Sequence, residues 1–328
     1  MNPPRSGPPT LAERARRFDR EQARGLRALA YRMLGSRAEA EDMVQEAWLR
    51  WAEVDESQVQ HAGAYLSRLV THLCLDRLRS PAHQRELYVG TWLPEPLVDE
   101  LQDWQPDPQS QAEYAQELSL AFMLTLERLT PLERAAFVLH DVFGLDFDAV
   151  GQRLLRSGTA CRQLASRARQ HVKAGYARVE VAEEERQRLL DAFLDALRGG
   201  DVDALARVLA EDAVLLSDGG GKAHAVPYPL HGGARIAKAL VGFTRQVDLR
   251  ALRVTRTRIN GLPGYVVQDA EGRPIQTVAL ALRPLASGDG GVRVTVAEIY
   301  VQRNPDKLGH LAGLAGASDV TSGPSGPS

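Results

Sequence analysis

The chain has 328 residues, of which 44% are hydrophobic and 25% are charged, and its formal net charge is -2. Such a composition is ordinary for a water-soluble protein, and the length is sufficient for two or three domains. The weakly negative charge argues against a free-standing general DNA-binding protein, so any affinity for DNA must be local or supplied by a partner. No apolar run reaches the roughly 20 residues that a membrane span needs, so we expect no membrane association.

The N-terminus and the cysteines indicate a cytoplasmic protein. Residues 1–5 lack the apolar core of a signal peptide and are expected to form a flexible tail. Cys74 and Cys161 each fall on an apolar helical stripe, which favours buried thiols over a disulfide or a metal site. We therefore expect a cytoplasmic protein without a metal ion or a cofactor.

Residues 18–54 are predicted to form two or three helices. Gly35 is expected to end one helix and Ser36 to cap the next, with Glu39 completing a capping box. The outer face of that second helix gathers Glu39, Glu41, Asp42, Gln45 and Glu46. Taken alone, this is the pattern of a solvated helix face, because acids in a first turn also complement the helix dipole.

Residues 61–79 form another amphipathic pattern. The apolar positions include Tyr65, Leu66, Leu69, Leu73 and Leu75. The positions between them include Arg68, His72, Asp76, Arg77 and Arg79. Aromatic and basic groups together suit single-stranded nucleic acid, but the same pattern suits a plain helix of a bundle.

The segment of residues 87–127 contains no lysine or arginine. Its first two-thirds are acidic and rich in proline, which predicts a stiffened linker. The prolines are Pro94, Pro96, Pro106 and Pro108, and the acids include Asp99, Glu100, Asp103 and Asp107. From Ser110 onward we expect the leading helix of the next module.

Residues 129–173 predict three helices. Thr130 and Glu133 can form a capping box at the start of a helix that runs to about Val142 and is ended by Gly144. Asp146 is expected to cap a short second helix, and a turn leads to a third helix over residues 159–173.

The third of these helices has one apolar stripe, made of Cys161, Leu164, Ala165, Ala168 and Val172. Its other positions are polar or basic and none is acidic; they include Arg162, Gln163, Ser166, Arg167, Arg169, Gln170 and Lys173. Two short helices with a basic second member predict a helix-turn-helix, and the alternative is an ordinary helical hairpin with a solvated face. Gly151 inside the first member costs about 1 kcal/mol against alanine, so we attribute it to close approach of the second.

From residue 183 the pattern changes to that of an α+β domain. Helices are predicted at 184–197, 201–209 and 234–243. Strands are predicted at 213–216, 251–259, 265–268, 277–283 and 292–301. We expect the strands to form a curved antiparallel sheet and residues 309–328 to be disordered.

Two blocks of this sequence resemble the extracytoplasmic-function (ECF) sigma factors of bacterial RNA polymerase. Residues 41–51 are similar to the core of sigma region 2, and residues 129–134 with 160–169 are similar to region 4. The blocks occur in the family's order, and the resemblance covers roughly residues 17–179. Leu155 and Gly158 depart from the family's usual turn, which leaves the tilt of the last helix open.

Three motifs extend the resemblance to the SigJ-like subgroup, which carries a SnoaL-like C-terminal domain. They are Trp-Leu-Pro-Glu-Pro-Leu at 92–97, Asp-Gly-Gly-Gly-Lys at 218–222 and Asn-Pro-Asp-Lys-Leu at 304–308. The implied fold is multi-domain: two all-α sigma domains, a region 2 helical bundle and a region 4 helix-turn-helix, followed by an α+β, cone-shaped domain of the nuclear transport factor 2 type. The implied boundaries are 10–82 for region 2, 83–112 for the linker, 113–180 for region 4, 183–308 for the SnoaL-like domain and 309–328 for the tail.

The resemblance implies a promoter-specificity factor that binds core RNA polymerase and promoter DNA. The expected polymerase-binding residues are Glu41, Asp42, Gln45, Glu46 and Arg50. The expected contacts to the minus-ten element are Tyr65, Arg68, His72, Arg77 and Arg79. The expected contacts to the minus-thirty-five element are Thr159, Arg162, Gln163, Ser166, Arg167 and Arg169.

We further expect the linker to dock on the C-terminal domain, which would regulate the factor in cis. The expected docking residues are Trp92, Leu93, Pro94, Leu97, Asp218, Gly219, Gly220, Gly221, Lys222, Asn304, Pro305, Asp306 and Lys307. The acidic linker could also mimic nucleic acid inside polymerase, or it could simply be a soluble spacer.

Two other functional classes stay open from the residues alone. A stand-alone helix-turn-helix regulator would bind DNA without polymerase, and a SnoaL-type enzyme would convert a small apolar ligand. Catalytic candidates are Asp218, His224, His231 and Asp248, but no pairing of a base with a nucleophile is visible. Lys222 does not complete a phosphate-binding loop, because the glycine spacing is too short. We predict no catalysis and leave open a small-molecule ligand of the C-terminal domain.

Overall fold

The computed structural model describes residues 10–80, 88–98, 120–175, 181–286 and 292–314. They form two compact units, each of which is described by itself. We call residues 10–80 and 122–175 the helical unit. Residues 88–98, 120–121, 181–286 and 292–314 belong to the second, which we call the mixed unit.

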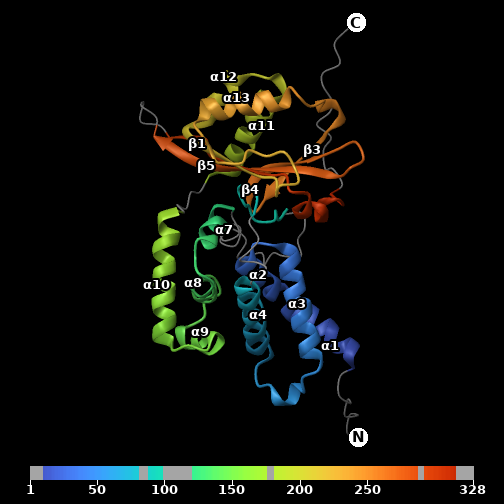
Figure 1. The fold of residues 1–328 in the computed structure, drawn as a ribbon, viewed down its shortest axis with the longest axis vertical. Helices are drawn as coiled ribbons and strands as arrows, with labels where there is room; N and C mark the ends of the chain where they lie inside the picture. The colour runs from blue at the N-terminus through green and yellow to red at the C-terminus, as the bar shows by residue number, and fades with distance from the viewer. Residues whose placement is uncertain (1–9, 81–87, 99–119, 176–180, 287–291, 315–328) are drawn as a thin grey trace. The chain divides into compact units, whose positions relative to one another are not determined.

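The helical unit begins with a bundle whose helices are shown in Figure 1. They are α1 Leu11–Phe18, a π-helical turn Asp19–Ala23, α2 Arg24–Leu34, α3 Arg37–Ala52, a short 3-10 helix Glu56–Gln58 and α4 Ala62–Arg79. Gly35 ends α2 at a φ of 69°, and the Ser36 side chain accepts a hydrogen bond from the Glu39 backbone N–H, so the predicted helix stop and cap are confirmed. The predicted capping box is not, because the Glu39 carboxylate accepts a hydrogen bond from Arg77. Helix α2 packs against α3 and α4, and its Leu29, Tyr31 and Met33 are buried.

The second part of the helical unit carries the predicted helix-turn-helix. Its helices are α7 Leu120–Glu127, of which residues 122–127 belong to this unit, α8 Pro131–Phe137, a π-helical turn Val138–Val142, α9 Phe147–Leu154 and α10 Gly158–Gly175. The Thr130–Glu133 capping box and the Asp146 cap are confirmed. The helix predicted to Val142 differs from the structure, because its last turn is π-helical; such turns often lie at functional sites.

The turn between α9 and α10 has a defined left-handed geometry. Leu155 adopts a φ of 54° and ends α9, a role that glycine usually takes. A Cβ on Gly151 would lie 2.6 Å from the carbonyl oxygen of Arg156 and 3.2 Å from the backbone nitrogen of Gly158. The close approach predicted for Gly151 is therefore confirmed, and it fixes how tightly α10 follows α9.

The mixed unit is built on one six-stranded sheet. Its helices are α11 Glu183–Gly199, α12 Val202–Val208 and α13 Gly233–Thr244. Its strands are β1 Leu209–Asp218, β2 Leu230–His231, β3 Arg253–Ile259, β4 Leu262–Gln268, β5 Pro274–Ala286 and β6 Val292–Gln302, in the order β2-β1-β6-β5-β4-β3. The antiparallel prediction is wrong at one pairing, because β1 and β6 are parallel. Helix α13 connects β2 to β3, which lies at the opposite edge of the sheet. Strands β3, β4, β5 and β6 are then successive antiparallel neighbours, so that β6 lies beside β1 and runs in the same direction.

Both faces of this sheet are covered. Helices α11, α12 and α13 lie on one face (Figure 1), where Tyr265 and Val267 join the apolar core with Phe193. Val266 points the other way, because side chains alternate along a strand, and it is fully buried as well. On that second face lie residues 88–98, whose Val98 pairs with Ile259 at the end of β3.

The C-terminal residues also differ from their prediction. Residues 309–314 were expected to be disordered, but they contain a 3-10 helix Gly309–Leu311 in which Leu311 is fully buried. Leu308, Leu311 and Leu314 recur every third residue, so a 3-10 turn places them on one side, where all three are buried. Residues 315–328 lie outside the described residues.

The remaining predictions concern the linker, the two cysteines, membrane spans and metal sites. The linker acids Asp99 to Asp107 and the helix start at Ser110 lie outside the described residues. Cys74 and Cys161 are both buried and free. Within the described ranges, no helix is long and apolar enough to cross a membrane, and no cluster of three or more His, Cys, Asp or Glu could hold a metal ion.

Candidate DNA-binding, polymerase-binding and linker-docking surfaces

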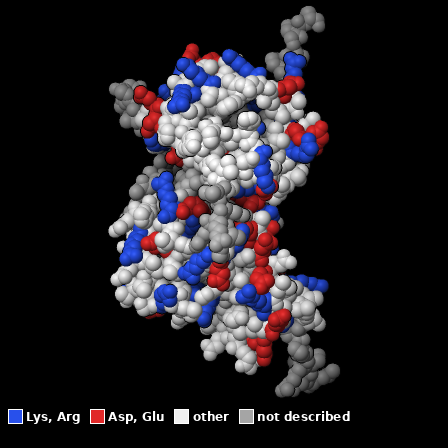
Figure 2. Space-filling model, viewed as in Figure 1, with Lys and Arg blue, Asp and Glu red and all other residues white. Residues whose placement is uncertain are grey.

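Helix α10 presents most of its predicted DNA-binding residues to solvent. Thr159, Arg162, Gln163, Ser166 and Arg167 are all exposed. On the opposite side Cys161, Ala165, Ala168 and Val172 are buried and Leu164 is half-buried. Arg169 is different, because it is half-buried and its Nε donates to Asp141 Oδ1 at 2.6 Å. Basic side chains accordingly gather over α10 in Figure 2, while acidic ones gather over α3.

The acidic face of α3 is partly neutralised by arginines of the same helix. Arg50 pairs with Glu46 at 2.8 Å, and Arg37 pairs with Glu41 at 2.8 Å. Asp42 and Gln45 are exposed between these pairs. Exposed pairs one helical turn apart contribute only a few tenths of a kcal/mol, so this face remains available to a partner.

Helix α4 divides its predicted DNA-binding residues into two groups. Tyr65, Arg68 and Arg79 are exposed. Arg77 instead donates from its Nε to Glu39 Oε1 at 2.7 Å, and His72 Nε2 donates to the carbonyl oxygen of Arg153 at 2.7 Å. The five residues therefore do not form a single free surface, because two of them are engaged inside the protein.

The contact of His72 belongs to a wider packing of α4 against α8 and α9. Arg153 Nε donates to Ser67 Oγ at 3.3 Å, next to the His72 contact. Arg134, which is almost fully buried, donates to the carbonyl oxygens of Met33 at 2.8 Å and Leu126 at 2.9 Å. No sequence signal indicated this packing, because a buried arginine on an amphipathic helix has the same pattern as a solvated one.

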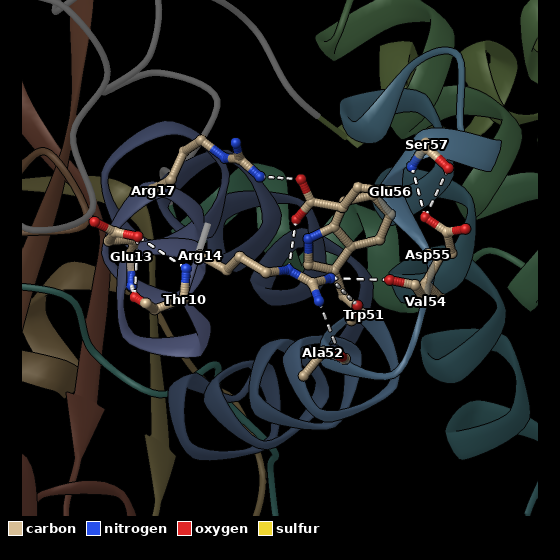
Figure 3. Close-up of polar contacts among 10 residues, drawn as sticks. All are labelled: Thr10, Glu13, Arg14, Arg17, Trp51, Ala52, Val54, Asp55, Glu56 and Ser57. Carbon is tan, nitrogen blue, oxygen red and sulfur yellow. Dashed lines mark hydrogen bonds and ion pairs between the residues drawn. The ribbon is translucent and has the colours of Figure 1, made fainter. Parts of the chain in front are cut away.

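The loop between α3 and α4 is held by Arg14, as Figure 3 shows. Its guanidinium donates to the carbonyl oxygens of Trp51 at 2.8 Å, Ala52 at 3.0 Å and Val54 at 3.1 Å. It also pairs with Glu56 at 2.7 Å, and Arg17 pairs with the same carboxylate. Burial raises the pKa of Glu56, but the hydrogen bonds from both arginines outweigh burial, so this pKa lies below its usual value.

Trp51 extends this arrangement to α4. Its ring lies under the Arg14 guanidinium, 6.0 Å from the ring centroid, and 5.5 Å from the ring of Tyr65 at an interplanar angle of 45°. The exposed Tyr65 is thus supported from below by a buried aromatic side chain. This support was missed by sequence reasoning, since Trp51 and Tyr65 lie on different helices.

In the mixed unit, Asp218 joins the predicted linker motif to the sheet. Its carboxylate is fully buried at the end of β1 and accepts hydrogen bonds from two groups of the linker. These are the Tyr88 hydroxyl at 2.5 Å and the Leu93 backbone N–H at 2.9 Å. Lys307 Nζ and Gln302 Nε2 donate to the same carboxylate at 2.8 Å and 3.1 Å.

Lys307 completes this arrangement from the other side of the linker. Its ammonium donates to the carbonyl oxygen of Leu93 at 2.6 Å. It also lies 4.7 Å from the ring centroid of Tyr88 and 4.6 Å from that of Trp92, within the range of cation–π attraction. Burial, together with the neighbouring Asp218 carboxylate, raises the pKa of the Tyr88 phenol.

The rest of the linker motif is held by hydrogen bonds between Leu97 and both the backbone and the side chain of Asn260. The Leu97 N–H donates to Asn260 Oδ1 at 3.0 Å, and the Asn260 N–H donates to the Leu97 carbonyl oxygen at 2.7 Å. Leu93, Pro94 and Leu97 are buried, while His310 pairs with Glu95 at 3.2 Å. Sequence reasoning found the motif but missed its partners Tyr88, Asn260, Gln302 and His310.

The glycine loop after β1 has steric reasons for its composition. A Cβ on Gly219 would lie 2.2 Å from the Ala223 carbonyl oxygen, and one on Gly220 would lie 2.2 Å from Asn304 Nδ2. Gly221 has a φ of 71°, a left-handed conformation that favours glycine. Lys222 and Asp306 pair with each other at the surface, and Pro305 is exposed beside them.

Comparison with known proteins shows to which family the chain belongs. A model of sigma-70 region 2 matches residues 18–84, and a model of sigma-70 region 4 matches residues 119–172. The chain is 39% identical over 222 residues to the ECF RNA polymerase sigma factor SigJ of Mycobacterium tuberculosis, covering 67% of this chain and 70% of SigJ. This chain belongs to the ECF sigma factors.

A second relative and a solved structure of SigJ agree with this assignment. The probable ECF sigma factor SigI of Mycobacterium tuberculosis is 33% identical over 184 residues, which cover 55% of this sigma factor and 62% of SigI. The crystal structure of Mycobacterium tuberculosis SigJ aligns with a TM-score of 0.67 and 31% identity, over 89% of this chain and 97% of that one. The helical sigma domains followed by an α+β region with a mixed sheet are therefore shared with SigJ.

In this sigma factor, the candidate catalytic residues do not converge. Asp218 is engaged by the linker, His224 lies in the loop after β1, and His231 lies on the two-residue strand β2. Asp248 caps a short 3-10 helix, Leu249–Ala251. The two histidines and Asp248 are exposed, so the structure offers no assembled acid–base pair among them.

Proposed function

We propose that this sigma factor binds core RNA polymerase and directs it to promoters, with region 2 reading the minus-ten element and region 4 the minus-thirty-five element. The observation that carries the proposal is the exposed, acid-free face of α10 at the end of a helix-turn-helix. Within the described residues, Arg162 and Arg167 make no ion pair, so their guanidinium groups can donate to base edges and phosphates.

The remaining surfaces fit the same role. Asp42 and Gln45 on α3 offer exposed polar groups to polymerase, and charge complementarity of this kind favours fast and correctly oriented docking. Tyr65 offers a ring on which an unstacked base can lie, and Arg68 and Arg79 can hold the neighbouring phosphates.

The packing of α4 against α8 and α9 requires a rearrangement on the promoter. By the positions in their names, the two elements lie about 25 base pairs apart, which corresponds to ~85 Å of duplex at 3.4 Å per base pair. Two modules in direct contact through Arg134 and Arg153 cannot span that distance. The proposed function therefore includes separation of regions 2 and 4 when polymerase and DNA bind.

The C-terminal domain is proposed to regulate the factor in cis through the linker. Residues 88–98 are held on the sheet by Asp218, Lys307 and Asn260. Because this linker lies between regions 2 and 4 in the chain, holding one stretch of it limits how far the two regions can move apart.

The test is transcription in vitro by core polymerase with full-length protein. We expect Arg167→Ala to lower promoter-specific transcription while binding to core polymerase is kept, and Trp92→Ala to change transcription without changing the fold. Gln170→Ala, on the same exposed helix, is the matched control for Arg167→Ala. If the parent protein neither binds core polymerase nor starts transcription at any promoter, the proposal is wrong; if only Trp92→Ala behaves as the parent, regulation through the linker is wrong.

A further inference from the structure

Arg162, an exposed arginine on α10, is supported by an aromatic side chain of α9. Its guanidinium carbon lies over the ring of Phe147, 5.1 Å from the ring centroid. This distance is within the range in which an arginine is attracted to the face of an aromatic ring. Phe147 is half-buried and is the first residue of α9, so its backbone is held by the Asp146 cap.

The Phe147 ring is itself fixed by His140. The two rings are stacked, with centroids 3.8 Å apart and an interplanar angle of 23°. His140 Nδ1 donates to the carbonyl oxygen of Leu145 at 2.6 Å, which holds the imidazole in one orientation. The π-helical turn Val138–Val142 contains His140, so this irregular turn contributes directly to the stack.

Arg162 therefore differs from the other arginines of α10. Arg169 is paired with Asp141 and has a carboxylate partner inside the protein. Arg162 has an aromatic support and, among the described residues, no carboxylate partner. Stacking restricts the rotamers of a long side chain without using up its N–H donors, so the fork of donors stays available to a base.

We infer that Phe147 is a positioning residue for minus-thirty-five recognition, which orients Arg162 before DNA is bound. This inference rests on the proposed function, in which Arg162 contacts a base edge. An arginine oriented in advance loses less conformational freedom on binding. The resulting gain in binding free energy is therefore confined to the one base pair that Arg162 reads. A purely structural role of Phe147 would instead affect all promoter sequences alike.

The test uses holoenzyme made from full-length protein and core polymerase, with promoters in which each base pair of the minus-thirty-five element is replaced in turn. Arg162→Ala identifies the base pair at which discrimination is lost. Phe147→Leu is expected to weaken discrimination at that same pair by about two- to fivefold. Phe147→Tyr keeps the ring and is expected to keep the discrimination, and Phe147→Leu combined with Arg162→Ala is expected to lose no more than Arg162→Ala.

The readout is a ratio between two promoters for one protein preparation, so a loss of folded protein cancels. Phe147→Met is the second ring-less variant if leucine does not give folded protein. An unchanged ratio, or an equal change at every base pair, in a ring-less variant overturns the role of Phe147 and leaves the proposed function intact. If Arg162→Ala weakens discrimination at no particular base pair, the proposed contact of Arg162 with a base is wrong, and so is the positioning role of Phe147.

Discussion

Helices α4 and α10 are both 18 residues long, and both carry arginines that we assign to promoter DNA, but their states differ. The outer face of α10 is exposed, with Arg162 and Arg167 facing solvent. On α4, His72 and Arg77 already have partners within the protein, and α8 and α9 pack against the helix. The two helices are thus not equally ready to bind DNA.

Under the proposed function, this difference means that recognition of duplex DNA and recognition of melted DNA are prepared differently. The residues assigned to the minus-thirty-five element, apart from Arg169, are already exposed. Of the residues assigned to the minus-ten element, His72 becomes free only if the contacts of α4 with region 4 are released. Because a packed interface has discrete states and does not deform continuously, this release is expected to behave as a switch.

The largest expected effect comes from the buried arginine that joins region 4 to region 2. Arg134→Met removes the side-chain donor to the Met33 carbonyl oxygen, one of the two donors to the Leu126 carbonyl oxygen and the ion pair with Glu127, at a cost of roughly 2–4 kcal/mol. We expect faster hydrogen exchange of the α4 amides and easier unfolding in urea. Arg128→Met, an exposed neighbour, is the control and should change stability by less than about 0.5 kcal/mol. Unchanged protection of α4 would show that Arg134 does not hold the two regions together.

A smaller effect is expected from two arginines of α4, Arg77, which pairs with Glu39, and Arg79, which is exposed. Arg79→Ala should reduce the salt dependence of promoter binding by about 0.7–0.9 in the slope of log K against log salt, because one phosphate contact is lost. Arg77→Ala should leave the slope unchanged and lower stability by about 0.5–1 kcal/mol, since its partner is Glu39. Binding of holoenzyme to partly melted promoter DNA at several salt concentrations measures both. Equal slopes for the two variants would mean that the Arg77–Glu39 pair opens on DNA.

The smallest effect concerns the loop before α4. The pKa of Glu56 is lowered from 4.5 in the folded protein, so its contribution to stability is present above that pH and is lost as the pH falls through the folded pKa. Glu56→Gln should remove this part of the acid sensitivity, which we expect to be below about 1 kcal/mol. Thermal unfolding from about pH 6 to about pH 3 measures it. Glu53→Gln, an exposed carboxylate of the same loop, is the control; an equal effect of both variants would rule out a specific role of the arginine pairs.

Much of the local structure could be predicted from the sequence, because it depends on residues a few positions apart. The Thr130–Glu133 box, the Asp146 cap and the stop at Gly35 each involve contacts within four residues. The apolar stripe of α10 follows from periodicity alone, and Cys161, Ala165 and Ala168 are fully buried as predicted. The family resemblance is carried by equally local blocks.

The direction of β6 relative to β1 and the order in residues 309–314 could not be predicted, because they depend on packing between distant parts of the chain. The same holds for the surfaces. Sequence patterns named Leu93, Asp218 and Lys307 but not Tyr88 or the contacts that join them. A short stretch of sequence determines which face of a helix is apolar. The tertiary structure decides which polar side chains are buried and which groups they bind. For this sigma factor, the sequence alone determined the family and its modules, and packing decided which arginines remain available to DNA.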